Sequence, residues 1–313
     1  MNVYHLQHYR IIFYRNWINA VNEVYSIHII KYMNIILVCI NNFQEYILIN
    51  IKQLLRLRHE RIYVITNGHF FEKFSEYRDS ITLVNSDSLE DQYEYSKHSA
   101  LCKEFRGGFW MLTSMRFFYI YSCMKKYDLE NVIHLENDVL VYYNCSVLMD
   151  KLDTKYLYLP FDTFSRNIAS IVYIPNHMMF KEILDRYDSG KNDMENFSTI
   201  MRQTNLIKNF PIYISDASDS SSTSECAFVS QNYDRFKCIF DAAAMGQYLG
   251  GVDPRNQGGN TVGFINETCV IKYNIYRFLW KDEDIRRPYL EVDGTVVPIF
   301  NLHIHCKDLN RFI

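Results

Sequence analysis

Short apolar runs rich in β-branched residues alternate with longer segments of helical pattern along most of the chain. Helices are predicted after the first strand to about residue 57, and over residues 109–126, 177–187 and 240–249. Strands are predicted over residues 34–40, 61–67, 80–86, 132–142, 156–160, 169–175 and 298–307. This alternation is typical of stacked βαβ units, so the sequence predicts an α/β fold in which helices flank a mostly parallel central sheet.

Polar residues gather where the first three predicted strands end. Asn41 and Asn42 follow the first strand directly, and the second and third strands also end in polar residues. In open α/β sheets, ligands bind at the carboxyl ends of the strands. The sequence therefore predicts a ligand site at this edge of the sheet, with Asn41 and Asn42 as part of it.

Residues 1–32 differ from the rest of the chain, because they lack Gly and Pro and are rich in Tyr and His. We expect an N-terminal helical extension here, followed by a single domain over residues 33–313. The extension has too few cations for a basic membrane anchor, but contact with a membrane surface, contact with a partner and a mis-assigned start codon are all left open. The polar segment 215–225 is low in complexity and predicts a mobile surface loop.

The composition of the chain limits which classes of partner and which cellular compartment are expected. The 313 residues carry 33 Lys and Arg against 36 Asp and Glu, and this balance argues against a nucleic-acid partner. The eight cysteines form no CxxC pair, which favours reduced thiols in a cytoplasmic protein, in the host cytoplasm if the source is viral. No stretch approaches the roughly 18 consecutive apolar residues that a transmembrane helix needs.

The stretch VIHLENDVLVY, residues 132–142, places two carboxylates inside a strand-forming run. Glu136 and Asp138 are two residues apart, so in an extended backbone their side chains point the same way and are able to share one divalent cation. His303 and His305 lie on one face of the last predicted strand and offer nitrogen ligands, which favour Mn²⁺ over Mg²⁺. Solvated carboxylates in a turn are the alternative, and the residues by themselves leave the two about even.

The same stretch resembles the Asp-x-Asp element of the GT-A glycosyltransferases, with Glu136 in place of the first Asp. The segment TSMRFFYI (113–120) is similar to the helix that precedes this element in glycogenin-like and LPS-galactosyltransferase-like members. FDAAAMGQYLGG (240–251) resembles their later acidic helix start, and NLHIHCK (301–307) resembles the C-terminal segment that completes their metal shell. These segments occur in the expected order between residue 33 and the end of the chain.

The resemblance implies a Rossmann-like GT-A domain with a nucleotide-sugar-binding half (33–145) and an acceptor half that includes the C-terminal metal and diphosphate segment (146–313). It implies a transferase that moves a sugar from a nucleoside diphosphate sugar, such as a UDP- or GDP-sugar, to a hydroxyl of a glycan, lipid or protein, with Mn²⁺ or Mg²⁺ as cofactor. The implied site residues are Glu136, Asp138, His303 and His305 for the metal, Asn41, Asn42, Arg116, Asn137 and Lys307 for the donor, Gln247 for the acceptor, and Asp241 for catalysis.

Other interpretations of these residues stay open. Arg116 fits an ordinary helix salt bridge as well as a donor contact, and Asp241 fits a helix cap as well as a catalytic carboxylate. Trp110 is interpreted as a core or surface aromatic residue rather than a platform for a sugar. A sugar nucleotidyltransferase would share the sheet and the metal, but the Gly-rich signature expected after the first strand is missing. A non-catalytic relative that binds glycans or a partner would not need the metal site.

Overall fold

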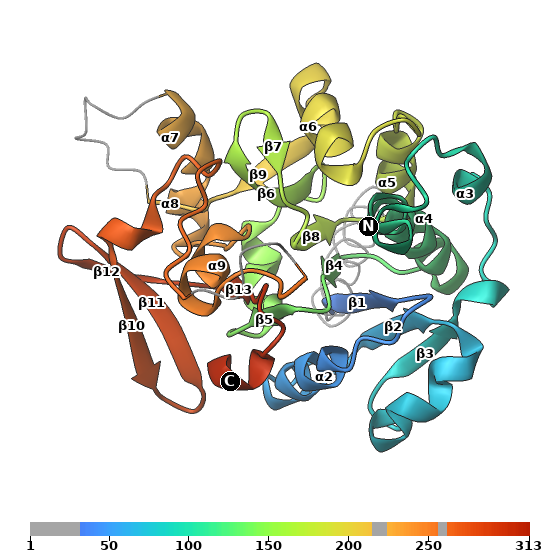
Figure 1. Ribbon diagram of the computed structural model, residues 1–313, viewed down its shortest axis with the longest axis horizontal. Helices are drawn as coiled ribbons and strands as arrows, with labels where there is room; N and C mark the ends of the chain where they lie inside the picture. The colour runs from blue at the N-terminus through green and yellow to red at the C-terminus, as the bar shows by residue number, and fades with distance from the viewer. Residues whose placement is uncertain (1–31, 215–223, 256–261) are drawn as a thin grey trace, which may run out of the picture. The chain divides into compact units, whose positions relative to one another are not determined.

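The central sheet is built from eight strands in the order β3-β2-β1-β4-β8-β6-β7, with β9 beside β6 (Figure 1). The computed structural model describes residues 32–214, 224–255 and 262–313. The strands of this sheet are β1 (Asn34–Cys39), β2 (Ile62–Thr66), β3 (Thr82–Asn85), β4 (Val132–Leu135), β6 (Leu157–Thr163), β7 (Arg166–Asn167), β8 (Ile171–Ile174) and β9 (Ile207–Phe210).

Helices cover both faces of this sheet. β1 pairs in parallel with β2 and β4, and β2 pairs in parallel with β3, whereas β8 runs antiparallel to β4. Along β1, Ile35 and Leu37 belong to the apolar core that also contains α2 (Tyr46–Arg56), while Ile36 belongs to the core that contains α4 (Phe109–Tyr127). Figure 1 shows α2 and α4 on opposite sides of the first strands. The predicted α/β class with a mostly parallel sheet flanked by helices is confirmed.

The run that contains the two carboxylates is broken rather than continuous. β4 ends at Leu135 and the backbone turns, with the Val139 N–H donating to the Glu136 carbonyl at 3.0 Å. β5 (Val139–Val141) then leaves the central sheet and pairs antiparallel with β13 (Asn301–His303). The prediction of one strand over residues 132–142 is therefore corrected. The turn places the polar side chains outside the buried sheet. A continuous extended strand would have buried them in the apolar core, which is costly for polar groups without partners.

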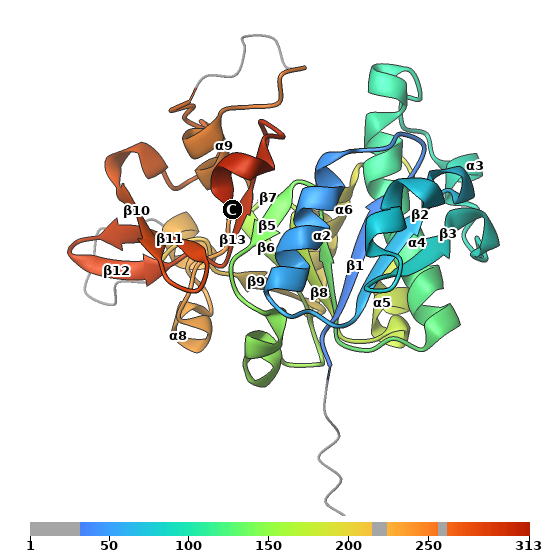
Figure 2. The same cartoon turned by 90° about the horizontal axis from the view of Figure 1, so that it is seen from below.

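The C-terminal part of the chain forms a separate small sheet before it returns to the site. β10 (Arg277–Asp282), β11 (Arg286–Val292) and β12 (Thr295–Pro298) pair antiparallel, and Figure 2 shows them at the opposite end of the domain from β3. The sequence pattern did not predict this sheet, because charged residues interrupt its apolar positions. The predicted strand 298–307 is also shorter, since β13 ends at His303.

The remaining elements are short. The other α-helices are α3 (Tyr95–His98), α5 (His177–Leu184), α6 (Asp193–Gln203), α7 (Ser224–Val229), α8 (Tyr233–Phe236) and α9 (Ala244–Gly250). Single 3₁₀ segments are η1 (Gly68–Tyr77), η2 (Ser86–Ser88), η3 (Phe105–Gly107), η4 (Cys145–Lys151), η5 (Tyr273–Ile275) and η6 (Leu309–Phe312). None of the helices in the described ranges combines the length and the apolar character needed to cross a bilayer.

Two predictions concern segments that the structure does not describe. The N-terminal helical extension falls on residues 1–31, and most of the predicted mobile loop falls on residues 215–223; both lie outside the described residues. Residues 33–313 form one compact unit. The division of this unit into a nucleotide half and an acceptor half stays a prediction.

Asn50 fixes the turn that follows β4. It lies on α2 with its side chain buried, and its amide Nδ2 donates to the carbonyl oxygens of Asn137 at 3.2 Å and Val139 at 2.9 Å. We expect Asn50→Leu to lower the free energy of unfolding by about 1–3 kcal/mol, because these buried carbonyls lose their donor. Urea denaturation measures the loss. Lys52→Leu, at an exposed position of the same helix, is the control, and equal stability of the two variants would contradict this role of Asn50.

Candidate metal and nucleotide site

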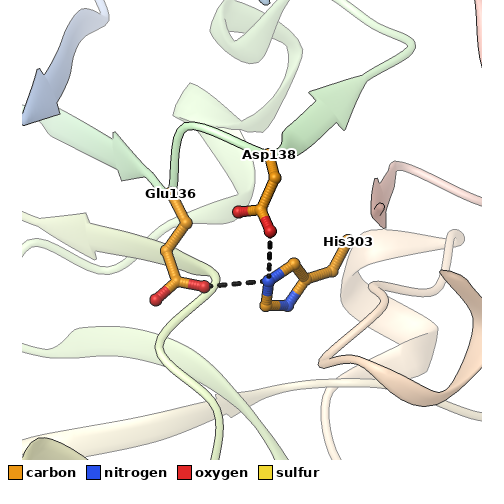
Figure 3. A group of neighbouring side chains, drawn as sticks. All are labelled: Glu136, Asp138 and His303. Carbon is orange, nitrogen blue, oxygen red and sulfur yellow. Dashed lines mark ion pairs between the residues drawn. The ribbon is translucent and has the colours of Figure 1, made fainter. Parts of the chain in front are cut away.

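Three potential ligands from distant parts of the chain meet beside the β4–β5 turn. Glu136 and Asp138 come from the turn itself, and His303 is the last residue of β13. One ligand atom of each residue lies within 4.8 Å of those of the other two. The His303 Nε2 atom is 3.0 Å from a Glu136 oxygen and 3.4 Å from an Asp138 oxygen, and Figure 3 shows both carboxylates directed at the ring.

The ring of His303 is oriented as in a metal ligand. Its Nδ1 atom lies 2.8 Å from the Ala242 carbonyl oxygen, which only accepts hydrogen bonds, so Nδ1 carries the proton. Nε2 is therefore the nitrogen that faces the two carboxylates, and it is the nitrogen that a shared cation would bind after losing its proton. A backbone acceptor behind the imidazole is the usual partner of a metal-binding histidine. Two carboxylates and one imidazole suit Mn²⁺, and the three residues fit a divalent cation.

The charges at this cluster depend strongly on one another. Burial opposes the charged form of His303, but Asp138 and Glu136 outweigh it and raise the pKa of His303 to about 10. Burial also opposes the charged carboxylates. Arg116 and His303 nevertheless hold the pKa of Glu136 below its usual range, and Lys307 and His303 do the same for Asp138. Both carboxylates are thus anionic ligands at neutral pH.

Two further cations flank the cluster. Lys307 Nζ contacts the Asp138 carboxylate. On the other side, the Arg116 guanidinium contacts Glu136 and also donates to an Asp193 oxygen at 2.9 Å. The side chain of Arg116 is only 10% exposed, so it binds two carboxylates as a buried bridge. Arg116 therefore forms salt bridges between elements and not within one helix, and its contact with a donor stays a prediction.

A cavity of about 850 Å³ opens beside these residues. Its floor contains the cluster, and its walls come from the β1–α2 connection, the first two turns of α4, the start of α6 and the C-terminal segment. The polar and charged residues that line it are Asn42, Gln44, Glu45, Arg106, Thr113, Arg116, His134, Glu136, Asn137, Asp138, Arg166, Asp193, Gln247, Asp253, Arg255, His303, His305 and Lys307.

Most residues predicted for the site therefore line one cavity, but their contacts differ. The Asn137 amide donates to the Val38 carbonyl at 2.7 Å and ties the turn to β1. Gln247 lines the cavity and accepts a hydrogen bond from Asn266 at 2.9 Å. Asn41 does not line the cavity; its backbone N–H donates to the Asn67 side chain at 2.7 Å.

His305 is near the cluster but is not part of it. Its ring lies 4.1 Å from the ring of His303, between centroids, and it lines the cavity. Burial, followed by the neighbouring His303 and Lys307, holds the pKa of His305 well below its usual value, so the ring is neutral. The three convergent ligand atoms within the described residues come from Glu136, Asp138 and His303 alone.

Asp241 is not among the residues that line the cavity. It is fully buried, and its carboxylate accepts hydrogen bonds from three backbone N–H groups. Two belong to the first turn of α9, Met245 at 3.0 Å and Gly246 at 2.8 Å, and the third belongs to His303 at 2.9 Å. This geometry differs from the open access expected of a catalytic base, because both oxygens accept backbone hydrogen bonds and Asp241 is not among the residues that line the cavity; its catalytic role stays a prediction. Of the alternatives given above, it resembles the helix cap.

Several charged lining residues were not found from the sequence. Asp193 begins α6 and carried no signal beyond the capping pattern that precedes it. Arg166 forms β7, a two-residue strand too short to predict. The carboxylate of Asp253 accepts hydrogen bonds from Arg255, from its backbone N–H at 2.8 Å, its Nε at 3.1 and 3.2 Å and an amino group at 2.7 Å, within a loop that has no apolar pattern. Only the fold brings these residues to the cavity.

Comparison with known proteins gives partial structural likeness only. No protein-family model and no curated protein matches the sequence. The glycosyltransferase GlyE of Streptococcus pneumoniae is similar over 57% of this chain and 45% of its own, with 14% identity and a TM-score of 0.39. Mouse xyloside xylosyltransferase 1 is similar over 58% of this chain and 86% of its own, with 10% identity and a TM-score of 0.40. A cytidylyltransferase from Leptospira borgpetersenii is similar over 60% and 78%, with 9% identity and a TM-score of 0.35.

The similar structures belong to two classes of enzyme, glycosyltransferases and nucleotidyltransferases. The chain spans less than half the length of GlyE. TM-scores this low assign no reaction to the chain. A functional proposal for this chain therefore rests on its own site residues.

Gly246 lets α9 pack against β13 closely enough to place His303. A Cβ atom at this position would lie 1.9 Å from the His303 carbonyl oxygen. We expect Gly246→Ala to displace His303, to lower the free energy of unfolding by about 1–3 kcal/mol and to weaken Mn²⁺ binding. Urea denaturation and calorimetric Mn²⁺ titration measure the two effects. Gly294→Ala is the control, because that glycine has a positive φ but open space around it, so the variant is strained without touching the site. Equal Mn²⁺ affinity in both variants would contradict the close-packing role.

Proposed function

We propose that the protein is a metal-dependent glycosyltransferase that moves a sugar from a nucleoside diphosphate sugar to a hydroxyl acceptor. The observation that carries this proposal is the convergence of Glu136, Asp138 and His303 on one point in the floor of a large cavity. Proteins grip a diphosphate through a hard cation held by a few ligands with its other positions open. The cluster supplies such a ligand set, and the cavity supplies room for the donor.

The metal is proposed to be Mn²⁺, with Mg²⁺ as the alternative, and its ligands to be Glu136, Asp138 and His303. When bound, the ion would supply positive charge to the departing diphosphate. Lys307 adds to this charge from the protein, because it lies against Asp138 at the edge of the cluster. Its Nζ is able to exchange the carboxylate for a phosphate oxygen, a charge-assisted contact of similar strength.

Arg116 is proposed to act as a positioning residue. Its guanidinium already binds Glu136 and Asp193. Its charge therefore compensates two buried carboxylates and holds the metal ligand Glu136 in place. The nucleotide is proposed to lie along the β1–α2 connection near Asn42 and Asn137, where ligands of open α/β sheets bind. The base is expected to be uracil or guanine.

In the proposed reaction, an acceptor hydroxyl oxygen forms a bond to the anomeric carbon while the bond from that carbon to the diphosphate breaks. The diphosphate leaves with the bonding electron pair, and the hydroxyl proton passes to solvent water. Gln247 is proposed to orient the acceptor from the cavity wall. Asp241 is proposed to hold His303 and α9 in register through its three backbone contacts, a positioning role in place of the base considered from the sequence.

Asp138→Asn tests the metal-dependent step. We expect the variant to lose at least about 100-fold in Mn²⁺ affinity, since even second-shell changes cost 10–100-fold. Stabilisation by UDP or GDP in the presence of Mn²⁺ should disappear with it. Calorimetry and thermal shift, each with and without Mn²⁺, measure these effects. Asp234→Asn, at an exposed carboxylate that does not line the cavity, is the control and should behave as the parent protein.

The same titration separates the rival functions. If neither nucleoside diphosphate stabilises the parent protein in a metal-dependent way, the transferase proposal fails. Consumption of a nucleoside triphosphate and a sugar 1-phosphate with release of pyrophosphate would show a nucleotidyltransferase in its place. Glycan binding that is unchanged in Asp138→Asn, without nucleotide binding, would show a non-catalytic glycan-binding protein.

A further inference from the structure

One wall of the cavity is aromatic. Phe105, Phe109 and Trp110 line it at the start of α4, and Phe105 is 48% exposed. Phe109 and Trp110 are half-buried, with their ring centroids 4.9 Å apart in an edge-to-face arrangement. Soluble proteins rarely keep neighbouring large aromatic side chains exposed in a cavity without a ligand for them.

The local sequence explains why these rings face the cavity. Arg106, Gly107 and Gly108 have φ values of 50°, 66° and 83°, a run of left-handed conformations that reverses the chain just before α4 begins. Two glycines make this turn possible, since a side chain is strained there. The chain therefore enters α4 with Phe109 and Trp110 in the first turn.

The aromatic wall continues along α4 to the metal cluster. Phe109, Thr113 and Arg116 lie on one face of the helix at spacings of four and three residues, and all three line the cavity. Seven residues of helix correspond to about 10 Å. The face thus changes from aromatic at Phe109, through a hydroxyl at Thr113, to the charged bridge at Arg116. Its length suits more than one sugar ring.

From this face we infer that the acceptor is a carbohydrate, and that one of its pyranose rings stacks on Trp110 with Phe109 beside it. The inference rests on the proposed function and narrows its acceptor from a glycan, lipid or protein to a glycan. A pyranose has an apolar face of C–H groups and a rim of hydroxyls. The wall offers both kinds of partner: aromatic faces for the C–H groups, and polar groups such as Arg106 and Asp193 in the adjoining lining for the hydroxyls.

Competing occupants fit this wall less well. A lipid chain would need apolar lining throughout, but the aromatic residues adjoin Arg106, Thr113 and Asp193. The nucleobase is expected at the β1–α2 connection, near Asn42, because that is where the central parallel strands end. The α4 wall is left for the acceptor.

The test compares Trp110→Ala with a matched variant of the same helix. Tyr127 lies at the other end of α4, about 26 Å from Trp110 by the helical rise, and is 39% exposed. It does not line the cavity. Trp110→Ala, Trp110→Phe and Tyr127→Ala of the full chain are applied to an array of pyranose oligosaccharides in the presence of Mn²⁺ and UDP or GDP. The best array ligand is then titrated in solution, and Mn²⁺-dependent nucleotide binding is measured in parallel.

We expect the parent protein and Tyr127→Ala to bind the same oligosaccharides. Trp110→Ala should lose about tenfold or more in glycan affinity, because it loses both the aromatic contact and the apolar area that the contact buries. Trp110→Phe should retain most of the affinity. Nucleotide binding should be equal in all four proteins.

Glycan binding that is equal in Trp110→Ala and the parent protein overturns the inference, and so does an array without any bound oligosaccharide. Either result leaves the proposed function intact as long as Mn²⁺-dependent nucleotide binding persists. Loss of nucleotide binding from the parent protein itself would instead remove the transferase proposal. Loss of nucleotide binding in Trp110→Ala alone would place the base on this wall and overturn the inference.

Discussion

Charge compensation around Glu136 and Asp138 is the constraint on which the site depends. Buried carboxylates are costly without partners, and each of these two is compensated from a different part of the chain. Arg116 of α4 meets Glu136, Lys307 meets Asp138, and His303 meets both. The electrostatic cost of the turn is thereby offset by cations on two separate segments, α4 and the C-terminal segment. The same contacts bring those segments to the edge of the sheet where ligands bind.

Hydrogen bonds to backbone groups hold the C-terminal segment in the position that brings His303 to the two carboxylates. β13 pairs with β5 directly after the acidic turn, and the buried carboxylate of Asp241 joins the first turn of α9 to the His303 N–H. Gly246 allows the two elements to approach so closely. His303 is therefore placed by a rigid framework and not by a flexible tail. Such preorganisation is what a metal ligand needs in order to keep its geometry during a reaction.

The cavity divides into regions of different chemistry around this cluster. The β1–α2 connection contributes two amides and a carboxylate beside apolar and aromatic residues, the C-terminal segment contributes Lys307 and two histidines, and α4 contributes an aromatic wall that leads to Arg116. A substrate with a charged diphosphate at its centre and sugar rings on one side matches this division. The proposed transfer reaction and the inferred glycan acceptor both follow from the same arrangement.

The sequence by itself determined the α/β class, the parallel first strands and the acidic pair, because apolar periodicity and a pair of carboxylates in an apolar run are local signals. It did not determine that the run breaks at Glu136, since only pairing with β13, more than 160 residues later, draws β5 out of the sheet. Asp193 joins the cluster through its contact with Arg116, and the Asp241 carboxylate accepts hydrogen bonds from three backbone N–H groups, two of α9 and one of His303. Trp110, which the sequence left as a core or surface aromatic residue, follows a left-handed turn and lines the cavity. Contacts between residues distant in sequence decide such roles, and no local pattern encodes them.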